Sequence, residues 1–180
     1  SDVATAIYDV VDAVMLSAES ASGSYPVEAV AMMDRIIQRV EADPLYRQML
    51  ESSRVEAFNT VSHAIMSAAR HIAHTIPISA IVAFTDSGST ALMAARERPE
   101  APILGLTPLV TTARMLSLVW GVHAAITPRI ISFGQMVSEG SQAAHTHEFA
   151  LHGQDVIITA GVPFGTSGTT NIIRVVKVEA

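Results

Sequence analysis

Residues 81–92 carry the residue types of a phosphate-binding loop, in the order that such a loop needs. Residues 81–84 are apolar and predict a buried strand, and Thr-Asp-Ser-Gly-Ser-Thr follows directly at 85–90. A helix-forming segment begins at Ala91. Unpaired backbone N–H groups and the helix dipole both favour an anion at the start of a helix. The segment therefore predicts a site for a phosphorylated ligand, either a substrate or a regulator.

The side chains of this loop have distinct predicted roles. Gly88 would let the backbone close on an oxyanion. Asp86 has the wrong charge for this purpose, and it would either turn outward as a helix cap or weaken phosphate binding. The alternative is an ordinary turn with a Ser or Asp cap, and the residues alone do not decide. Four hydroxyls would donate hydrogen bonds to the phosphate, those of Thr85, Ser87, Ser89 and Thr90.

A second loop, residues 161–171, combines hydroxyl residues with glycines. Gly161, Gly165 and Gly168 permit positive φ angles and a close approach of the backbone. No Gly-Lys-[Ser/Thr] follows, so the loop is not a P-loop, and it opens no helix, so the dinucleotide-binding fingerprint fits poorly. A hairpin loop without any ligand is the alternative.

The composition limits the class of protein. Of 180 residues, 49% are hydrophobic and 16% are charged, which suits an α/β domain with an appendage. The net charge of −6 argues against a general nucleic-acid binder. No apolar run reaches the about 18 residues of a membrane-spanning helix, and cysteine is absent. No signal peptide is visible, so we expect a cytoplasmic protein; since the first residue is Ser, we expect a fragment.

The first 42 residues predict a helix, a strand and a second helix. Apolar residues recur at helical spacing within 1–10, residues 13–16 are typical of a short buried strand, and Pro26 opens a helix that continues to Val40. One βα unit of this size cannot bury its own faces, so it needs neighbours. Two further helices are expected beyond it, at residues 45–53 and 57–75.

The rest of the chain predicts a sheet that helices cover on both faces. Apolar, β-branched runs are the strand candidates, at 80–84, 102–106, 122–126, 155–160 and 172–178. Helical segments alternate with them, at 88–98, 109–119 and 132–150. This alternation predicts an α/β fold with a mostly parallel five-stranded sheet. Only a Gly/Thr loop separates the last two strands, so the final strand is expected to be an antiparallel partner at one edge.

Several longer motifs resemble one enzyme family. Residues 12–21 (Asp-Ala-Val-Met-Leu-Ser-Ala-Glu-Ser-Ala) and 23–30 are similar to the end of the catalytic barrel of pyruvate kinases. Other motifs resemble the C-terminal regulatory domain of that family, at 95–99, 102–108, 112–114, 118–122, 155–163 and 168–171. The motifs cover nearly the whole chain in order, and the chain is identified as a member of the family.

This resemblance implies the fold and the activity. Pyruvate kinases transfer phosphate from phosphoenolpyruvate to ADP in glycolysis on a (β/α)8 barrel, with Mg²⁺ and commonly K⁺. Their C-terminal domain carries an allosteric sugar-phosphate site and part of the tetramer interface. Residues 1–42 would be the last helix, strand and helix of the barrel, and residues 43–180 the regulatory domain. The family's catalytic and metal-binding residues would lie upstream of Ser1, so this chain is expected to be inactive alone and to bind neither cation.

The resemblance also favours the anion site in the first loop. Loop 161–170, with Gly165 and Gly168, would close over the ligand, and it contains no Lys or Arg. Because a bisphosphate normally needs a second cationic clamp, we predict an effector with one phosphate, such as a hexose or pentose monophosphate or AMP. The other expected partners are the rest of the barrel and further copies of the chain in a homo-oligomer. A free-standing phosphometabolite sensor and a purely structural assembly domain are the alternative functions.

Ser17 and Glu19 follow the strand predicted at 13–16, and the resemblance puts them beside the substrate pocket. Ser17 would join a water-mediated proton path. The alternative is that both residues only brace their loop by hydrogen bonds to the backbone. The histidines show no metal-ligand spacing, so no metal site is predicted.

Overall fold

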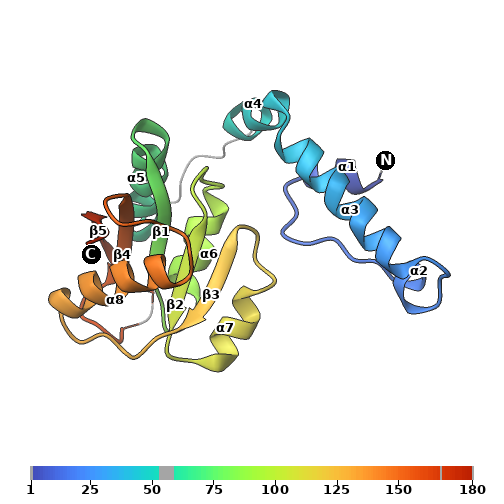
Figure 1. Ribbon diagram of the computed structural model, residues 1–180. Coiled ribbons are helices and arrows are strands. Elements are labelled where there is room, and N and C mark those ends of the chain that lie inside the picture. The colour runs from blue at the N-terminus through green and yellow to red at the C-terminus, as the bar shows by residue number, and fades with distance from the viewer. Residues whose placement is uncertain (1, 53–58, 167, 180) are drawn as a thin grey trace. The chain divides into compact units, whose positions relative to one another are not determined.

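The computed structural model describes residues 2–52, 59–166 and 168–179, and the chain divides into two compact units, residues 1–56 and 57–180 (Figure 1). Each unit has its own apolar core. Within the described part of the chain, no helix is both long and apolar enough to cross a membrane. Residue 53 of the helix predicted at 45–53, and residues 57 and 58 of the one predicted at 57–75, lie outside the described residues. Asn59 and Thr60 are described and are not helical, because the side chain of Thr60 caps a helix that begins at Val61.

The smaller unit is built from short helices around one longer helix. Its elements are α1 (Asp2–Tyr8), α2 (Ala18–Ala21), α3 (Pro26–Glu41) and α4 (Pro44–Ser52). Helix α3 begins at Pro26, as predicted, because the missing N–H of proline has no partner in a first turn anyway. Its small core consists of Ile7, Val40, Tyr46 and Leu50. Since Tyr46 and Leu50 come from α4, this compact unit extends beyond residue 42; the predicted family-domain boundary at 42/43 stays a prediction.

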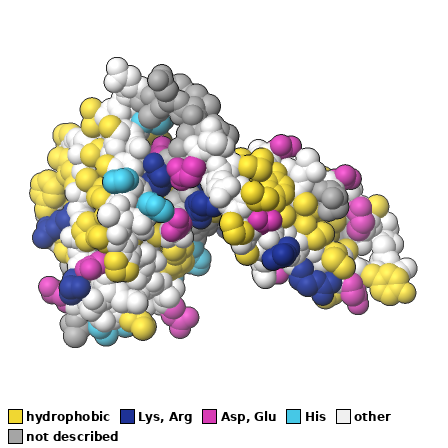
Figure 2. Space-filling view, turned by 90° about the horizontal axis from the view of Figure 1, so that it is seen from above, with side chains coloured by type: hydrophobic (Ala, Val, Ile, Leu, Met, Phe, Trp, Pro, Cys, Tyr) yellow, Lys and Arg dark blue, Asp and Glu magenta, His cyan; other side chains and the backbone are white. Residues whose placement is uncertain are grey.

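The strand predicted at residues 13–16 does not form. These residues run without regular secondary structure, and Met15 is 85% exposed. A strand needs a neighbouring strand for its backbone N–H and C=O groups, and the described residues of this unit supply none. Apolar side chains remain on the surface of the unit as a result, as Figure 2 shows, and Tyr25 and Val27 are more than 70% exposed.

The larger unit contains a five-stranded sheet, as predicted. Its strands are β1 (Ile78–Phe84), β2 (Ile103–Thr107), β3 (Val122–Ile126), β4 (Asp155–Gly161) and β5 (Thr170–Lys177). The order across the sheet is β3-β2-β1-β4-β5. The first four strands are parallel, and β5 pairs antiparallel with β4 at one edge. The predicted fold class is therefore confirmed.

Helices cover both faces of this sheet (Figure 1). They are α5 (Val61–Thr75), α6 (Ser89–Arg96), α7 (Val110–Leu116) and α8 (Phe133–Thr146). Along β1, Ala80, Val82 and Phe84 pack into the core that includes Met136 of α8, whereas Ile81 and Ala83 pack into the opposite core with α5 and α6. Burial on both faces explains why the central strands read as continuous apolar runs in the sequence.

All four of these helices are shorter than the sequence predicted, and α5 begins only at Val61. Helix α6 ends at Arg96 rather than at residue 98, because Arg98 adopts a φ of 46° and Pro99 follows. Helix α8 ends at Thr146, because Glu148 has a φ of 62°. Helix α7 covers 110–116 of the predicted 109–119.

Candidate functional site

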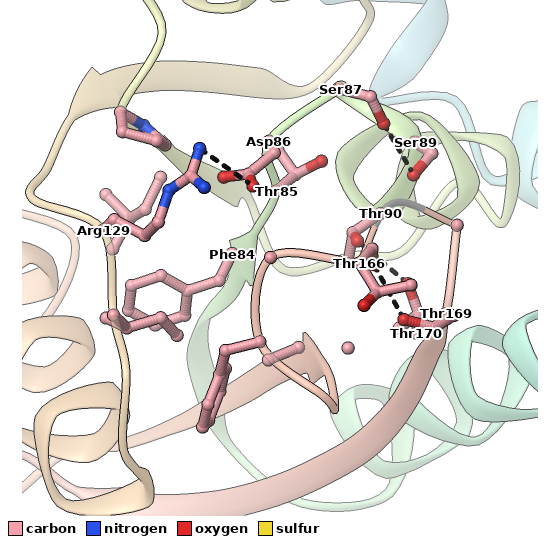
Figure 3. Close-up of a pocket in the computed structure, with 18 of the residues that line it drawn as sticks. Phe84, Thr85, Asp86, Ser87, Ser89, Thr90, Arg129, Thr166, Thr169 and Thr170 are labelled. Carbon is pink, nitrogen blue, oxygen red and sulfur yellow. Dashed lines mark hydrogen bonds and ion pairs between the residues drawn. The ribbon is translucent and has the colours of Figure 1, made fainter.

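The two loops that the sequence singles out meet beyond the carboxyl ends of the parallel strands. Strands β1 and β4 are parallel neighbours, so their carboxyl ends lie side by side, and the first loop leaves β1 where the second leaves β4. After β1 the chain continues to β2 on one side, while β4 lies on the other, and such a switch point opens a crevice. A pocket of about 510 Å³, including the solvent at its mouth, lies there (Figure 3).

Most of the predicted ligand-binding residues line this pocket. Gly88 is not part of the lining. Its φ is 91°, its N–H donates to Thr85 Oγ1 at 2.8 Å, and it is the N-cap residue of α6. No side chain caps α6, so the expected Ser or Asp cap is absent, while an ordinary turn without a ligand stays the alternative. The predicted residues that do line the pocket are Thr85, Ser87, Ser89, Thr90, Gly165 and Gly168.

The hydroxyls of the first loop divide into two groups. Thr85 and Thr90 are buried, and each has a partner within the protein: Gly88 N–H for Thr85, and Thr170 Oγ1 at 2.9 Å for Thr90. Ser87 is exposed, and its Oγ donates to Ser89 Oγ at 3.2 Å. Thr85 and Thr90 therefore hold the walls together, whereas Ser87 and Ser89 can rotate to bind a ligand.

The second loop is held by its own hydrogen bonds. The side chain of Asn171 both accepts from Val162 N–H at 2.9 Å and donates to Val162 C=O at 2.7 Å. Thr169 Oγ1 donates to Thr166 C=O at 2.8 Å. Ser167, within the loop range given above, lies outside the described residues. The bonds of Asn171 and Thr169 fix the approach of the loop to the pocket from the β5 side.

Arg129 is a pocket residue that the sequence analysis missed. It follows β3, and its Nη2 lies 3.3 Å from Asp86 Oδ2. Asp86 is therefore not the outward helix cap that the sequence allowed. Strand β3 ends at the same edge of the sheet as β1, and Arg129 comes three residues after Ile126, which is the signal that was available. The two loops carry no cation of their own, and this neighbouring segment supplies one.

Ser17 and Glu19 lie in the smaller unit, where Ser17 is the N-cap residue of α2 and Glu19 lies in the first turn of that helix; both are exposed. The backbone N–H of Ser17 donates to Glu19 Oε2 at 3.2 Å, and Ser20 Oγ donates to Ser17 C=O at 3.3 Å. These bonds match the bracing role that the sequence analysis gave as the alternative. A place beside a substrate pocket stays a prediction for both residues.

No metal centre is found among the described residues, where no three His, Cys, Asp or Glu side chains gather as ligands. Three histidines instead bind a carboxylate or a backbone oxygen: His74 Nδ1 lies 3.1 Å from Glu100 Oε1, His145 Nδ1 lies 3.2 Å from Ala150 C=O and His152 Nδ1 lies 2.7 Å from Glu179 C=O.

The fold and the pocket define an α/β domain whose pocket lies at a switch point of a mostly parallel sheet. A family model described as "Pyruvate kinase, alpha/beta domain" matches residues 63–176, and one described as "Pyruvate kinase, barrel domain" matches residues 1–30. The chain belongs to the pyruvate kinase family, which confirms the resemblance seen in its motifs.

Curated relatives agree with this assignment. A pyruvate kinase of Methylorubrum extorquens is 47% identical over 175 residues, covering 97% of this chain and 37% of the relative. One from Agrobacterium vitis is 45% identical over 177 residues, covering 98% and 37%. One from Geobacillus stearothermophilus is 42% identical over 175 residues, covering 97% and 30%. The chain thus spans about a third of the length of these relatives.

Proposed function

We propose that this chain is a C-terminal portion of a pyruvate kinase, and that the pocket at the carboxyl edge of its sheet binds a phosphorylated regulator. The observation that carries the proposal is the convergence of three segments, residues 85–90, 127–130 and 161–170, on one pocket. They bring hydroxyls, the start of a helix and one guanidinium together.

The chemistry of this pocket suits a single phosphate. The first N–H groups of α6 have no partner inside the helix and no side-chain cap, so they are available to phosphate oxygens. Ser87 and Ser89 add hydroxyl donors, and Arg129 adds a positive charge. Because Asp86 offsets part of that charge, the pocket favours a sugar monophosphate or an AMP-like ligand over a bisphosphate.

The proposed parent reaction is the transfer of phosphate from phosphoenolpyruvate to ADP in glycolysis. Mg²⁺ and K⁺ would assist that reaction in the barrel of the parent enzyme. We expect no phosphate transfer by these 180 residues alone, because they span only about a third of the length of the curated relatives. The exposed Met15, Tyr25 and Val27 fit a unit that packs on the rest of a barrel.

Regulation would follow from a difference in ligand affinity between two arrangements of the domain. A ligand shifts such an equilibrium only by as much as it binds one arrangement more tightly than the other. In a homo-oligomeric, cytoplasmic enzyme, this domain would pass the shift to neighbouring subunits and to the barrel.

Calorimetric titration of the chain with glucose 6-phosphate, ribose 5-phosphate, AMP and fructose 1,6-bisphosphate tests the proposal. We expect binding of at least one monophosphate, and loss of that binding in Ser87→Asp, since a second carboxylate beside Asp86 repels phosphate. Ser138→Asp, an exposed change on α8 outside the pocket, is the matched control. Absence of binding by all four ligands would leave an assembly role for the domain.

A further inference from the structure

The mouth of the pocket holds one cation and one anion, and they already bind each other. Arg129 and Asp86 point toward one another in Figure 3, with a single contact of 3.3 Å between Nη2 and Oδ2. Among the described residues that line the pocket, no other side chain carries a full charge. A phosphate that enters the pocket therefore meets a guanidinium that already forms an ion pair with a carboxylate of the same chain.

The side chain of Arg129 can leave Asp86 and bind a ligand. Its side chain is 55% exposed, and its guanidinium also lies near the second loop, since a Cβ built on Gly165 would be 3.7 Å from Nη1. Asp86 is more restricted, because its side chain is only 22% exposed and its backbone carbonyl accepts a 2.8 Å hydrogen bond from Thr112 Oγ1. The guanidinium can turn toward a ligand, whereas the carboxylate stays at the mouth.

We infer that Asp86 is a built-in competitor for Arg129 and thereby sets the charge class of the ligand that the pocket accepts. This inference rests on the proposed function, in which the pocket binds a phosphorylated metabolite. A first phosphate takes Arg129 from Asp86 and is held by the start of α6 and by Ser87 and Ser89. A second phosphate near the mouth faces the released carboxylate with no further cation on the lining.

Asp86 also discriminates in favour of neutral, hydroxyl-bearing groups. A carboxylate accepts hydrogen bonds from hydroxyls but repels another anion at the same distance. Once Arg129 has moved to the phosphate, Asp86 Oδ1 and Oδ2 are free to accept from a sugar. The ligand class that satisfies both charges is a phosphate monoester with free hydroxyl groups near the phosphate.

The test compares the affinities of glucose 6-phosphate and fructose 1,6-bisphosphate by titration calorimetry in four versions of the chain: wild type, Asp86→Asn, Arg129→Gln and Asp155→Asn. The asparagine keeps the shape of Asp86 and removes its charge. We expect Asp86→Asn to raise the affinity for the monophosphate by about three- to tenfold and the affinity for the bisphosphate by more. The preference of the pocket for a ligand with one phosphate should therefore become smaller. Arg129→Gln should lower the affinity for both ligands.

Asp155→Asn is the matched control. Asp155 pairs with Lys177 at 3.1 Å with side chains that are 32% and 62% exposed, close to the values for Asp86 and Arg129, but it opens β4 and so lies at the opposite edge of the sheet. Its removal changes the net charge equally and should leave both affinities within about twofold of the wild type.

The outcomes separate this inference from the proposed function. If the wild type binds glucose 6-phosphate and Asp86→Asn binds it equally or more weakly, Asp86 positions Arg129 and the competitor role is wrong, while the proposed function stands. If only Asp86→Asn binds, the competitor role is supported and the natural chain is not a sensor. If no version binds either ligand, the competitor role fails, while the proposed function is decided separately by the titrations with ribose 5-phosphate and AMP.

Discussion

The conformation of Gly88 makes the first loop sensitive to a single added methyl group. Gly88 has a φ of 91°, and a Cβ built on it would lie 2.5 Å from Met115 Cε. An alanine in the left-handed region costs about 1–2 kcal/mol. Met115 is 43% exposed, so its terminal methyl can move away for about another 0.5–1 kcal/mol. Together, Gly88→Ala should lower the free energy of unfolding by about 2 kcal/mol.

Urea unfolding followed by tryptophan fluorescence measures this change in the larger unit, because Trp120 is the only tryptophan of the chain. Gly153→Ala is the control, since Gly153 has a φ of 85° but no atom within 4 Å of an added Cβ. Gly153→Ala should lower the free energy of unfolding only by the backbone cost of about 1–2 kcal/mol, without the further cost of moving Met115. Met115→Ala in the Gly88→Ala background should recover part of the difference. Equal losses in Gly88→Ala and Gly153→Ala would refute the close approach of Met115 to the loop.

Two further stability predictions concern buried contacts of the same unit, both measured by the same unfolding assay. Thr90→Val leaves the buried hydroxyl of Thr170 without its 2.9 Å partner and should lower the free energy of unfolding by about 1–3 kcal/mol. The double change Thr90→Val with Thr170→Val should lower it by less than the sum of the two single changes, and additive losses would contradict the pairing. Gly140→Ala places a Cβ 2.9 Å from Ile158 Cδ1 and should destabilise the unit by about 1–3 kcal/mol. On the same helix, the Cβ of Gly134→Ala would meet only Ser132 Oγ at 4.0 Å, so this change should be neutral or stabilising.

The sheet could be predicted from the sequence because each strand carries its own signal. Residues 80–84 and 155–160 are continuous apolar runs, and they form central strands whose two faces are both covered. Residues 13–16 carry the same kind of signal and form no strand. The difference lies in the partners: β1 and β4 pair with each other, whereas the described smaller unit offers no strand to residues 13–16.

The candidate site could be predicted only in part, because its residues come from three separate loops. The loop at 85–90 has a local signature, since hydroxyls and a glycine stand between a strand and a helix. Arg129 has none: the segment around it becomes a pocket wall only because β3, β2 and β1 are parallel and adjacent, which brings their carboxyl ends together. Because all parallel strands of a sheet end on the same side, residues that follow any of them, Arg129 included, are candidates for the missing cation.

The bond between Thr90 and Thr170 has a mechanical consequence. Thr90 lies in the first turn of α6, whose start forms part of the pocket wall, and Thr170 is the first residue of the outermost strand. Both residues are buried, so water does not compete for this hydrogen bond. Because this bond joins two buried side chains, a displacement of the pocket wall would either break it or carry the start of β5 along with α6.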